Sequence, residues 1–191
     1  HAEGYKSEAR GDSSHAEGIQ SEASGSGAHA EGGYIKDNGT YVSGGIASGN
    51  ASHAEGVGTT ASGMDSHAEG YKTEALNNHA HAEGNLTHAI GGAAHAEGRE
   101  TEASGNYSHA EGRGTKALGQ YSHTSGYGTV ANNEAEFACG KFNLSSENTL
   151  FSIGYGTNDK NRKNVFEITA DGSIYIIKDG TRVCLQDILG I

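Results

Sequence analysis

SHAEGIQSEASGSGAHAEG, residues 14–32, contains the tetrapeptide His-Ala-Glu-Gly twice, fourteen residues apart. The tetrapeptide opens the chain at His1 and occurs eight times, the last time at residues 109–112. Successive copies keep this spacing except at one longer interval, where removal of residues 33–42 restores the register. Nine such units, together with the inserted segment 33–42, therefore make up residues 1–136. A fixed period of this length predicts a solenoid with one coil per unit.

Each unit reads approximately His-Ala-Glu-Gly-x-x-Thr-x-Ala-x-Gly-x-x-Ser, which suits two short strands and two tight turns. Because side chains alternate along a strand, the first Ala shares a face with Ser and Gly, and the second Ala shares one with Thr and Gly. The second Ala occurs in all nine units, as Ala9, Ala23, Ala47, Ala61, Ala75, Ala89, Ala103, Ala117 and Ala131. We therefore expect an all-β, thin roll of nine coils, about 4.8 Å apart, with an interior of Ala, Thr, Ser and Gly.

The composition excludes several other classes of protein. The 191 residues include 31 Gly, no Pro and no Trp, so a conventional apolar core cannot be built from most of the chain. Strict periodicity argues against disorder. The net charge is −11, and the acidic excess lies in residues 1–136, which hold 18 acidic and 7 basic residues. Nucleic acid is therefore excluded as a partner, since phosphate binding requires basic surfaces.

Two cysteines, Cys139 and Cys184, are too few for a disulfide framework and lack the spacing of a metal knuckle. We expect both to be free, buried thiols. No stretch is long and apolar enough to span a membrane, so we expect no direct membrane insertion. No signal peptide is visible, but the chain starts in mid-repeat, as a cut fragment would.

The outward positions of the first strand are His nine times and Glu eight times, whereas those of the second strand vary. A uniform column requires a uniform environment. Stacked glutamates about 4.8 Å apart would repel by about 3–4 kcal/mol per pair at an effective dielectric near 20, so a buried column needs its His neighbours. We expect this strand to pack against copies of itself in a homotrimer, with His of one chain meeting Glu of another. The predicted interface residues are His1, Glu3, His15, Glu17, His29, Glu31, His53, Glu55, His67, Glu69, His81, Glu83, His95, Glu97, His109, Glu111 and His123.

Catalysis is a poor explanation of the repeated His–Glu pair, because eight equal pairs on a flat face form no cleft. The chain is therefore predicted to be no enzyme and to need no cofactor. A metal ladder along the histidines stays open as an alternative, although no further type of ligand recurs beside them.

The repeat unit resembles the 14-residue head repeats of trimeric autotransporter adhesins, of the YadA-like or Hep/Hag type. Their strand motif, Ser-Val-Ala-Ile-Gly, corresponds here to SHAEG at residues 14–18, 52–56, 66–70 and 108–112, with His and Glu in place of Val and Ile. The resemblance covers residues 1–136. It implies a left-handed parallel β-roll in a homotrimer, with the His and Glu positions facing the threefold interface.

Four tyrosines are candidate receptor contacts. The inserted GYIKDNGTYV predicts a β-hairpin with a type I′ turn at Asn38-Gly39 and with Tyr34 and Tyr41 on its arms. The hairpin is either a receptor-contacting finger or a brace on a neighbouring chain. Tyr107 and Tyr121 occupy the same repeat position one rung apart. They are either a platform for sugar rings or ordinary loop residues.

Residues 137–191 are predicted to form a separate, β-rich region that caps the solenoid and sets the trimer. Strands are expected in EFACGKFN, TLFSIGYG, NVFEITADG and SIYIIKDGTRVCLQDIL, with turns at Asp171-Gly172 and Asp179-Gly180. LQDIL is expected to start a short helix or a stalk. Most of the large apolar residues lie in this region, which therefore predicts the conventional core of the chain. FSIGYGTNDKNRKNVFEITADGSIYI resembles segments that follow such repeats in tail fibres of phages and prophages.

These observations predict a trimeric fibre module that attaches to a cell surface, a glycan or the extracellular matrix. Its place would be extracellular, in a virion tail fibre or on a bacterial surface. The alternatives are the head of a bacterial surface adhesin, a pure spacer and, less favoured, an ion-binding repeat protein.

Overall fold

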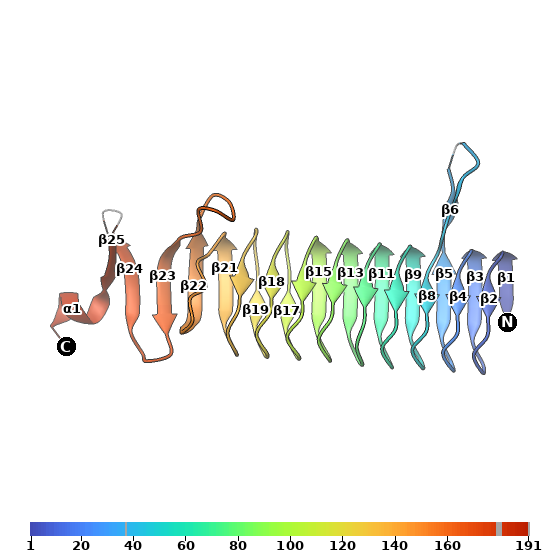
Figure 1. Cartoon of the computed structure of the whole chain (residues 1–191), viewed down its shortest axis with the longest axis horizontal. Coiled ribbons are helices and arrows are strands. Elements are labelled where there is room, and N and C mark those ends of the chain that lie inside the picture. Colours follow the sequence, from blue (N-terminus) through green and yellow to red (C-terminus); the bar gives the residue numbers. More distant parts are fainter. Residues whose placement is uncertain (37, 179–180, 191) are drawn as a thin grey trace.

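A computed structural model describes residues 1–36, 38–178 and 181–190 of the chain. It is a parallel β-solenoid, in which strands stack as rungs along one long axis and the two termini lie at opposite ends (Figure 1). The first sheet contains eleven parallel strands: β1 (Ala2–Tyr5), β3 (His15–Ile19), β5 (His29–Gly32), β9 (His53–Val57), β11 (His67–Tyr71), β13 (His81–Asn85), β15 (His95–Arg99), β17 (His109–Ala110), β19 (His123–Thr124), β21 (Phe137–Lys141) and β22 (Thr149–Tyr155). The second sheet contains nine: β2 (Glu8–Ala9), β4 (Glu22–Ala23), β8 (Ile46–Ala47), β10 (Thr60–Ala61), β12 (Glu74–Ala75), β14 (His88–Ala89), β16 (Glu102–Ala103), β18 (Lys116–Ala117) and β20 (Val130–Ala131).

The solenoid has about eleven turns and not the nine that the count of 14-residue units predicts. The parallel pairing continues beyond Glu136, because β21 pairs with β19 and β22 pairs with β21. Phe137 pairs with His123 and Phe151 with Phe137, so the step of the repeat persists after the His-Ala-Glu-Gly motif has ended. Parallel pairing depends on backbone register and on small inward residues, and Ala138 and Ser152 supply these.

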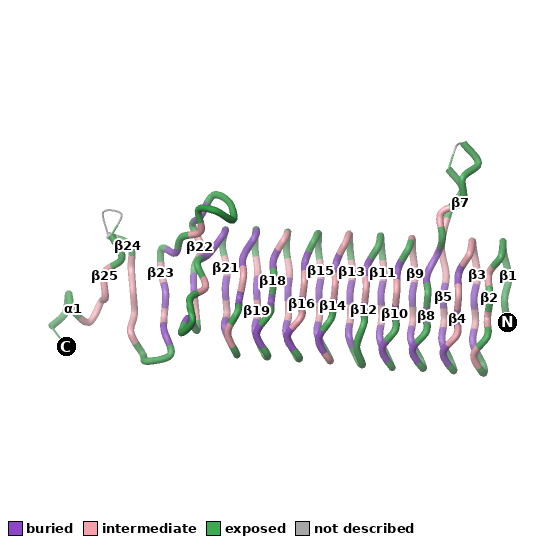
Figure 2. Tube along the Cα trace, viewed as in Figure 1, coloured by how far each residue is buried: buried purple, intermediate pink, exposed green. Residues whose placement is uncertain are grey.

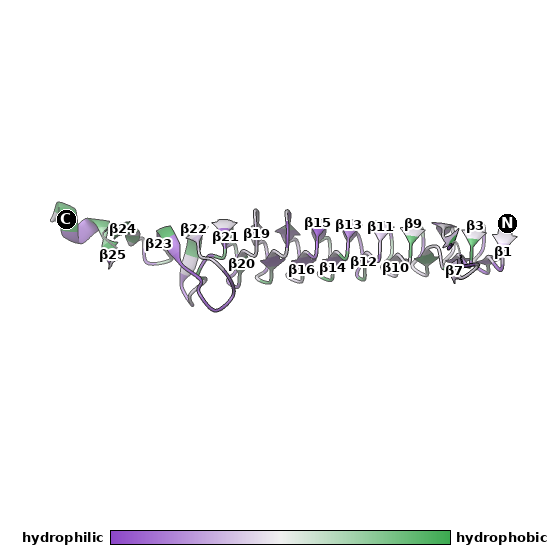
Figure 3. Ribbon diagram, turned by 90° about the horizontal axis from the view of Figure 1, so that it is seen from above, coloured by the Kyte–Doolittle hydropathy of each residue, from purple (hydrophilic) through white to green (hydrophobic). Residues whose placement is uncertain are grey.

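The interior of the roll is confirmed to be made of small residues. Its core cluster consists of alanines, among them Ala16, Ala23 and Ala61, which are inaccessible to solvent. Thr59 and its counterparts on other rungs are buried beside them. Seen from above, the two sheets form a thin, elongated slab (Figure 3). Side chains this small let the two sheets lie close together, which explains the slab.

The glycine that ends each tetrapeptide is required by the backbone. Gly84 has a φ of +110°, and a Cβ atom there would lie 2.2 Å from the carbonyl oxygen of Gly98 on the next rung. The same close approach recurs along the column, for example between Gly56 and Gly70. No other residue combines this dihedral angle with this lack of bulk.

Serine in the last position of the unit closes the turn before the first strand. The Ser66 Oγ donates a hydrogen bond of 2.7 Å to the carbonyl oxygen of Gly63, and Ser14 and Ser108 do the same in their own coils. The backbone of the turns is also paired from rung to rung: the Lys72 N–H donates to the Val57 carbonyl over 2.8 Å. The turns are therefore hydrogen-bonded from rung to rung like the strands, and each coil fixes the backbone position of the next.

The insertion forms the predicted hairpin, β6 (Tyr34–Ile35) paired antiparallel with β7 (Tyr41–Val42), and it projects from the solenoid (Figure 1). The predicted type I′ turn is wrong. Ile35 pairs with Tyr41, and the Lys36 N–H donates to the Thr40 carbonyl, which leaves three residues in the connection. A type I′ turn has two, whereas a three-residue connection usually carries a left-handed glycine, as Gly39 does at φ +78°.

The C-terminal strands extend the first sheet as a single antiparallel layer. β23 (Asn164–Thr169) pairs with β22, β24 (Ile174–Lys178) with β23, and β25 (Thr181–Cys184) with β24. The predicted turn at Asp171-Gly172 links β23 to β24; the predicted turn at Asp179-Gly180 lies outside the described residues. LQDIL forms the short helix α1 (Leu185–Leu189). Among the described residues, no helix is long and apolar enough to cross a membrane.

The conventional core predicted for this region is absent from the described residues. Phe142 is the one large apolar side chain among them that is buried, and no described residue after Thr169 is buried (Figure 2). Ile153, Val165 and Ile177 are exposed. The reason is that, within the described residues, no second sheet lies over β24 and β25, so their apolar side chains stay at least partly exposed.

Candidate functional site

The outward face of the first sheet carries two parallel columns of side chains, which we call the His–Glu face. Its residues are the nine histidines and eight glutamates of the tetrapeptide positions, from His1 to His123. Strand pairing places like on like: His53 lies against His67 and Glu55 against Glu69. From His15 to His109 the imidazole rings stack with centroids 4.7–4.9 Å apart and planes within 9° of parallel. The predicted columns are thus formed by the register of the coil.

The two columns contact each other within one chain. The Nε2 atom of His53 lies 3.6 Å from a carboxylate oxygen of Glu55 and 3.8 Å from one of Glu31 on the preceding rung. His109 Nε2 approaches Glu97 to 3.2 Å. His and Glu therefore already meet inside a single chain, and their meeting between chains stays a prediction. The His53 and Glu55 side chains are still 35% and 41% exposed, so the face is open to a partner.

Burial and neighbouring rings lower the pKa of two histidines of the column, His95 and His123. Burial lowers the pKa of His95, and the neighbouring rings of His109 and His81 lower it further. The pKa of His123 is lowered in the same way, by burial and by His109. In the Glu column, a hydrogen bond to Glu17 and burial raise the pKa of Glu31. At His95, His123 and Glu31 the stack therefore favours the uncharged side chain, which limits repulsion between like neighbours.

Acidification is expected to destabilise the fold. Because the folded-state pKa values of His95 and His123 lie below the ordinary value of 6.5, their contribution is complete above that pH and is lost as the pH falls through it. Between about pH 8 and pH 5 the melting temperature should fall by several degrees, on the order of 5 °C. His95→Gln should reduce this dependence, and His79→Gln, an exposed site outside the column, should not. A melting temperature unchanged over this range would contradict the prediction.

The columns continue beyond the tetrapeptides with different chemistry. Phe137 and Phe151 follow the His column, with ring centroids 4.8 Å between His123 and Phe137 and 5.4 Å between the two phenylalanines. Cys139 and Ile153 take the places of Glu. Sequence reasoning missed these rungs, although FACGK and FSIGY share the period of the repeat and its fourth-position glycine. The face therefore changes from polar to apolar toward the C-terminus.

Both cysteines are free thiols, as predicted, but each is half-buried and not buried. Cys139 is an outward residue of the first sheet, where only neighbouring rungs cover it, and this partial burial raises the pKa of its thiol.

The four candidate receptor tyrosines form two separate groups. Tyr107 and Tyr121 stack with centroids 5.3 Å apart and are 60% and 53% exposed, so they form an accessible aromatic pair. Tyr41 stacks on Tyr5 with centroids 4.1 Å apart, which braces the hairpin against the first coil of its own chain. Tyr34 is exposed on the hairpin. The structure does not bring the hairpin together with Tyr107 and Tyr121, because they belong to different coils.

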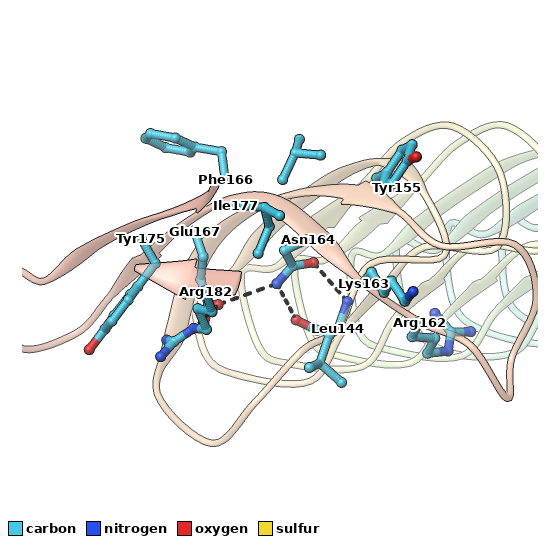
Figure 4. A pocket seen from close by; sticks show the side chains of 11 residues that line it. Leu144, Tyr155, Arg162, Lys163, Asn164, Phe166, Glu167, Tyr175, Ile177 and Arg182 are labelled. Atoms are coloured by element: carbon cyan, nitrogen blue, oxygen red, sulfur yellow. Dashed lines mark hydrogen bonds and ion pairs between the residues drawn. The ribbon is translucent and has the colours of Figure 1, made fainter. Parts of the chain in front are cut away.

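A hollow of about 320 Å³ lies where β22 to β25 meet the solenoid (Figure 4). Aromatic and cationic side chains line it, including Tyr155, Tyr175 and Arg182. The Arg182 guanidinium lies 3.3 Å from the centroid of the Tyr175 ring, and its Nε is 3.3 Å from Glu167. The positive charge of Arg182 is thus already paired within the chain, with Glu167 and the Tyr175 ring. The sequence did not predict this hollow.

No protein-family model matches the sequence, and no curated protein is significantly similar to it.

Proposed function

We propose that the chain is a non-enzymatic, homotrimeric fibre module that presents surfaces for attachment to a cell, a glycan or the extracellular matrix. The observation that carries this proposal is the flat His–Glu face, which is half exposed in a single chain and becomes apolar at Phe137 and Phe151. Aromatic contact continues from Phe151 to Phe166 on β23, with ring centroids 6.0 Å apart. A continuous face with one type of residue per column suits packing against copies of itself around an axis.

The scarcity of large buried side chains also supports association. An alanine core buries little apolar area per residue, and several apolar residues of β22 to β24, such as Ile153, Val165 and Ile177, are exposed on one chain. A symmetric partner surface would cover Ile153 and Val165 and add the burial that the single chain lacks. A left-handed sense of the coil belongs to the same proposal, through the resemblance to adhesin heads.

The solution mass of the chain at neutral pH is expected to be three times its 19.6 kDa. Light scattering on the size-exclusion peak measures it. Ile153→Glu, which extends the Glu column, should lower the mass or weaken the trimer, because it removes apolar area from the proposed interface. Leu118→Glu is the matched control, since Leu118 follows β18 of the other sheet. A stable, folded monomer would contradict the proposal.

Attachment is proposed to use many weak contacts multiplied by three copies. The stacked, exposed pair Tyr107 and Tyr121 suits the face of a sugar ring. On a glycan array or on host cells, the double variant Tyr107→Ala with Tyr121→Ala should lose binding at least tenfold, on the order of one stacked ring. Tyr71→Ala, at an exposed tyrosine of another coil, is the control. A trimer that binds no surface or glycan would indicate the spacer alternative.

The place of such a fibre is proposed to be extracellular, in a phage tail fibre or on a bacterial surface. The resemblance of the C-terminal segment to phage and prophage fibres favours the virion. The head of a bacterial adhesin is the alternative within the same architecture, and the nature of the bound surface would separate the two.

A further inference from the structure

Five groups on the His–Glu face bring imidazole nitrogens and carboxylate oxygens together. Within each group, three potential ligand atoms lie within 4.8 Å of one another. The groups are His1, Glu3 and His15; His29, Glu31 and His53; His53, Glu55 and His67; His81, Glu83 and His95; and Glu97, His109 and Glu111. Four of the five combine two histidines from adjacent rungs with one glutamate.

The distance between the two columns suits a tetrahedral ion. Bonds of about 2.0–2.2 Å to nitrogen and oxygen place neighbouring ligand atoms about 3.3 Å apart. The observed Nε2-to-carboxylate distances of 3.7 Å in the His81–Glu83 pair and 3.2 Å in the His109–Glu97 pair are close to this value. Between rungs, the rings must tilt toward each other to share an ion. Imidazole rings on adjacent rungs can tilt in this way without a change in strand pairing, because the ring planes of His109 and His123 already differ by 34°.

Most of the histidine nitrogens that face the Glu column lie near a carboxylate but make no hydrogen bond in the described part of the chain. The Nε2 atom is inaccessible to solvent and makes no hydrogen bond within the described part of the chain in seven histidines: His15, His29, His53, His67, His81, His95 and His123. An imidazole nitrogen held in this way, beside a carboxylate, is a preformed ligand. A cation between the columns would also offset the repulsion within the stack of glutamates.

We propose that the His–Glu face binds divalent ions of the zinc type, each held by ligands from adjacent rungs. Imidazole with carboxylate selects Zn²⁺ and its transition-metal neighbours over Ca²⁺ and Mg²⁺, which prefer oxygen ligands alone. Two of the five groups share His53, so four can be filled together on one chain. The remaining coordination positions are left to water or to a partner molecule.

Isothermal titration of the chelator-treated full chain, prepared without a histidine tag, tests the proposal. Zn²⁺ should bind with a stoichiometry near four per chain, and Ca²⁺ should not bind. The double variant His81→Gln with His95→Gln should lower the Zn²⁺ stoichiometry by one, because it empties one group and shares no residue with another.

The matched control is His79→Gln with His88→Gln, which removes the two histidines outside the column and should leave the stoichiometry unchanged. If the column variant fails to fold by circular dichroism, Glu83→Gln replaces it and should weaken one site at least tenfold. Two results would overturn the proposal: no Zn²⁺ binding by the folded chain, or binding that the control removes and the column variants do not.

The mass of the chelator-treated chain separates this inference from the proposed function. A trimer that binds no Zn²⁺ overturns the metal site alone. A monomer that binds Zn²⁺ through the column overturns the trimeric fibre alone.

Discussion

Gly84→Ala is expected to lower the free energy of unfolding by about 3 kcal/mol or more, through backbone strain and steric overlap with the next rung. A Cβ atom at this position would lie 2.2 Å from the Gly98 carbonyl oxygen, which is backbone and is fixed by the ladder. The φ of +110° adds strain for any residue with a side chain. Urea unfolding followed by circular dichroism measures the loss.

Gly92→Ala is the matched control for this prediction. A Cβ atom at Gly92 would meet a side-chain oxygen of Asn106 at 3.5 Å, an ordinary contact, and the backbone there does not have the unusual dihedral angle of Gly84. Its unfolding midpoint should therefore stay close to that of the unsubstituted chain. Equal midpoints for the two variants would show that the stacked rungs tolerate a methyl group and would contradict the close approach.

Glu136→Ala is expected to destabilise the chain by about 3–5 kcal/mol, the cost of removing one member of a buried, hydrogen-bonded set. Glu136 is fully buried where other coils carry Ser or Ala. One of its carboxylate oxygens accepts four hydrogen bonds of 2.8–3.0 Å, from the backbone N–H groups of Asn132 and Asn133, the Asn133 amide and the Ser145 hydroxyl. Without it, the Asn133 N–H and the Ser145 hydroxyl lose this acceptor, and the junction between the repeats and the last coils loses its shared carboxylate.

Two further variants make the Glu136 prediction specific. Burial raises the pKa of Glu136 despite its four donors, so Glu136→Gln, which keeps one accepting oxygen without the charge, should cost less, about 1–2 kcal/mol. Glu134→Ala removes an exposed carboxylate two residues away and should leave the unfolding midpoint unchanged. A loss in Glu136→Ala no larger than in Glu134→Ala would mean that this carboxylate does not stabilise the junction.

The interior was readable from the sequence because the inward positions are small in every unit, with the single exception of Glu136 in the ninth. Ala at the ninth position and Thr, Ser or Gly two residues earlier leave one geometry, a thin roll, and the structure confirms it. The outward columns were equally readable, since the constant period of the repeat places His53 over His67 whatever the surroundings. The hairpin was predicted from its turn residues, but the three-residue connection depends on strand register, which the dipeptide Asn38-Gly39 alone does not specify.

The end of the solenoid and the C-terminal core were both predicted wrongly, each for a reason that lies in the tertiary structure. Counting 14-residue units stops the coil at nine, whereas the backbone ladder needs only small inward residues and a glycine, which FACGK and FSIGY retain. Apolar residues such as Ile153 and Val165 suggest a core by composition, yet a core needs a second layer. The described chain supplies none over β24 and β25.

The sequence by itself determined the period, the small interior and the two columns, because these follow from local repetition: each coil has the same residues and therefore the same neighbours. Only the tertiary structure decided which atoms the columns bring together, such as His53 Nε2 between Glu31 and Glu55, and where the coil gives way to a single sheet. Those outcomes depend on the rotation of side chains between rungs and on contacts such as that of Glu136 with Ser145. A repeat pattern does not specify side-chain rotation or these contacts, because each depends on how one coil lies against the next.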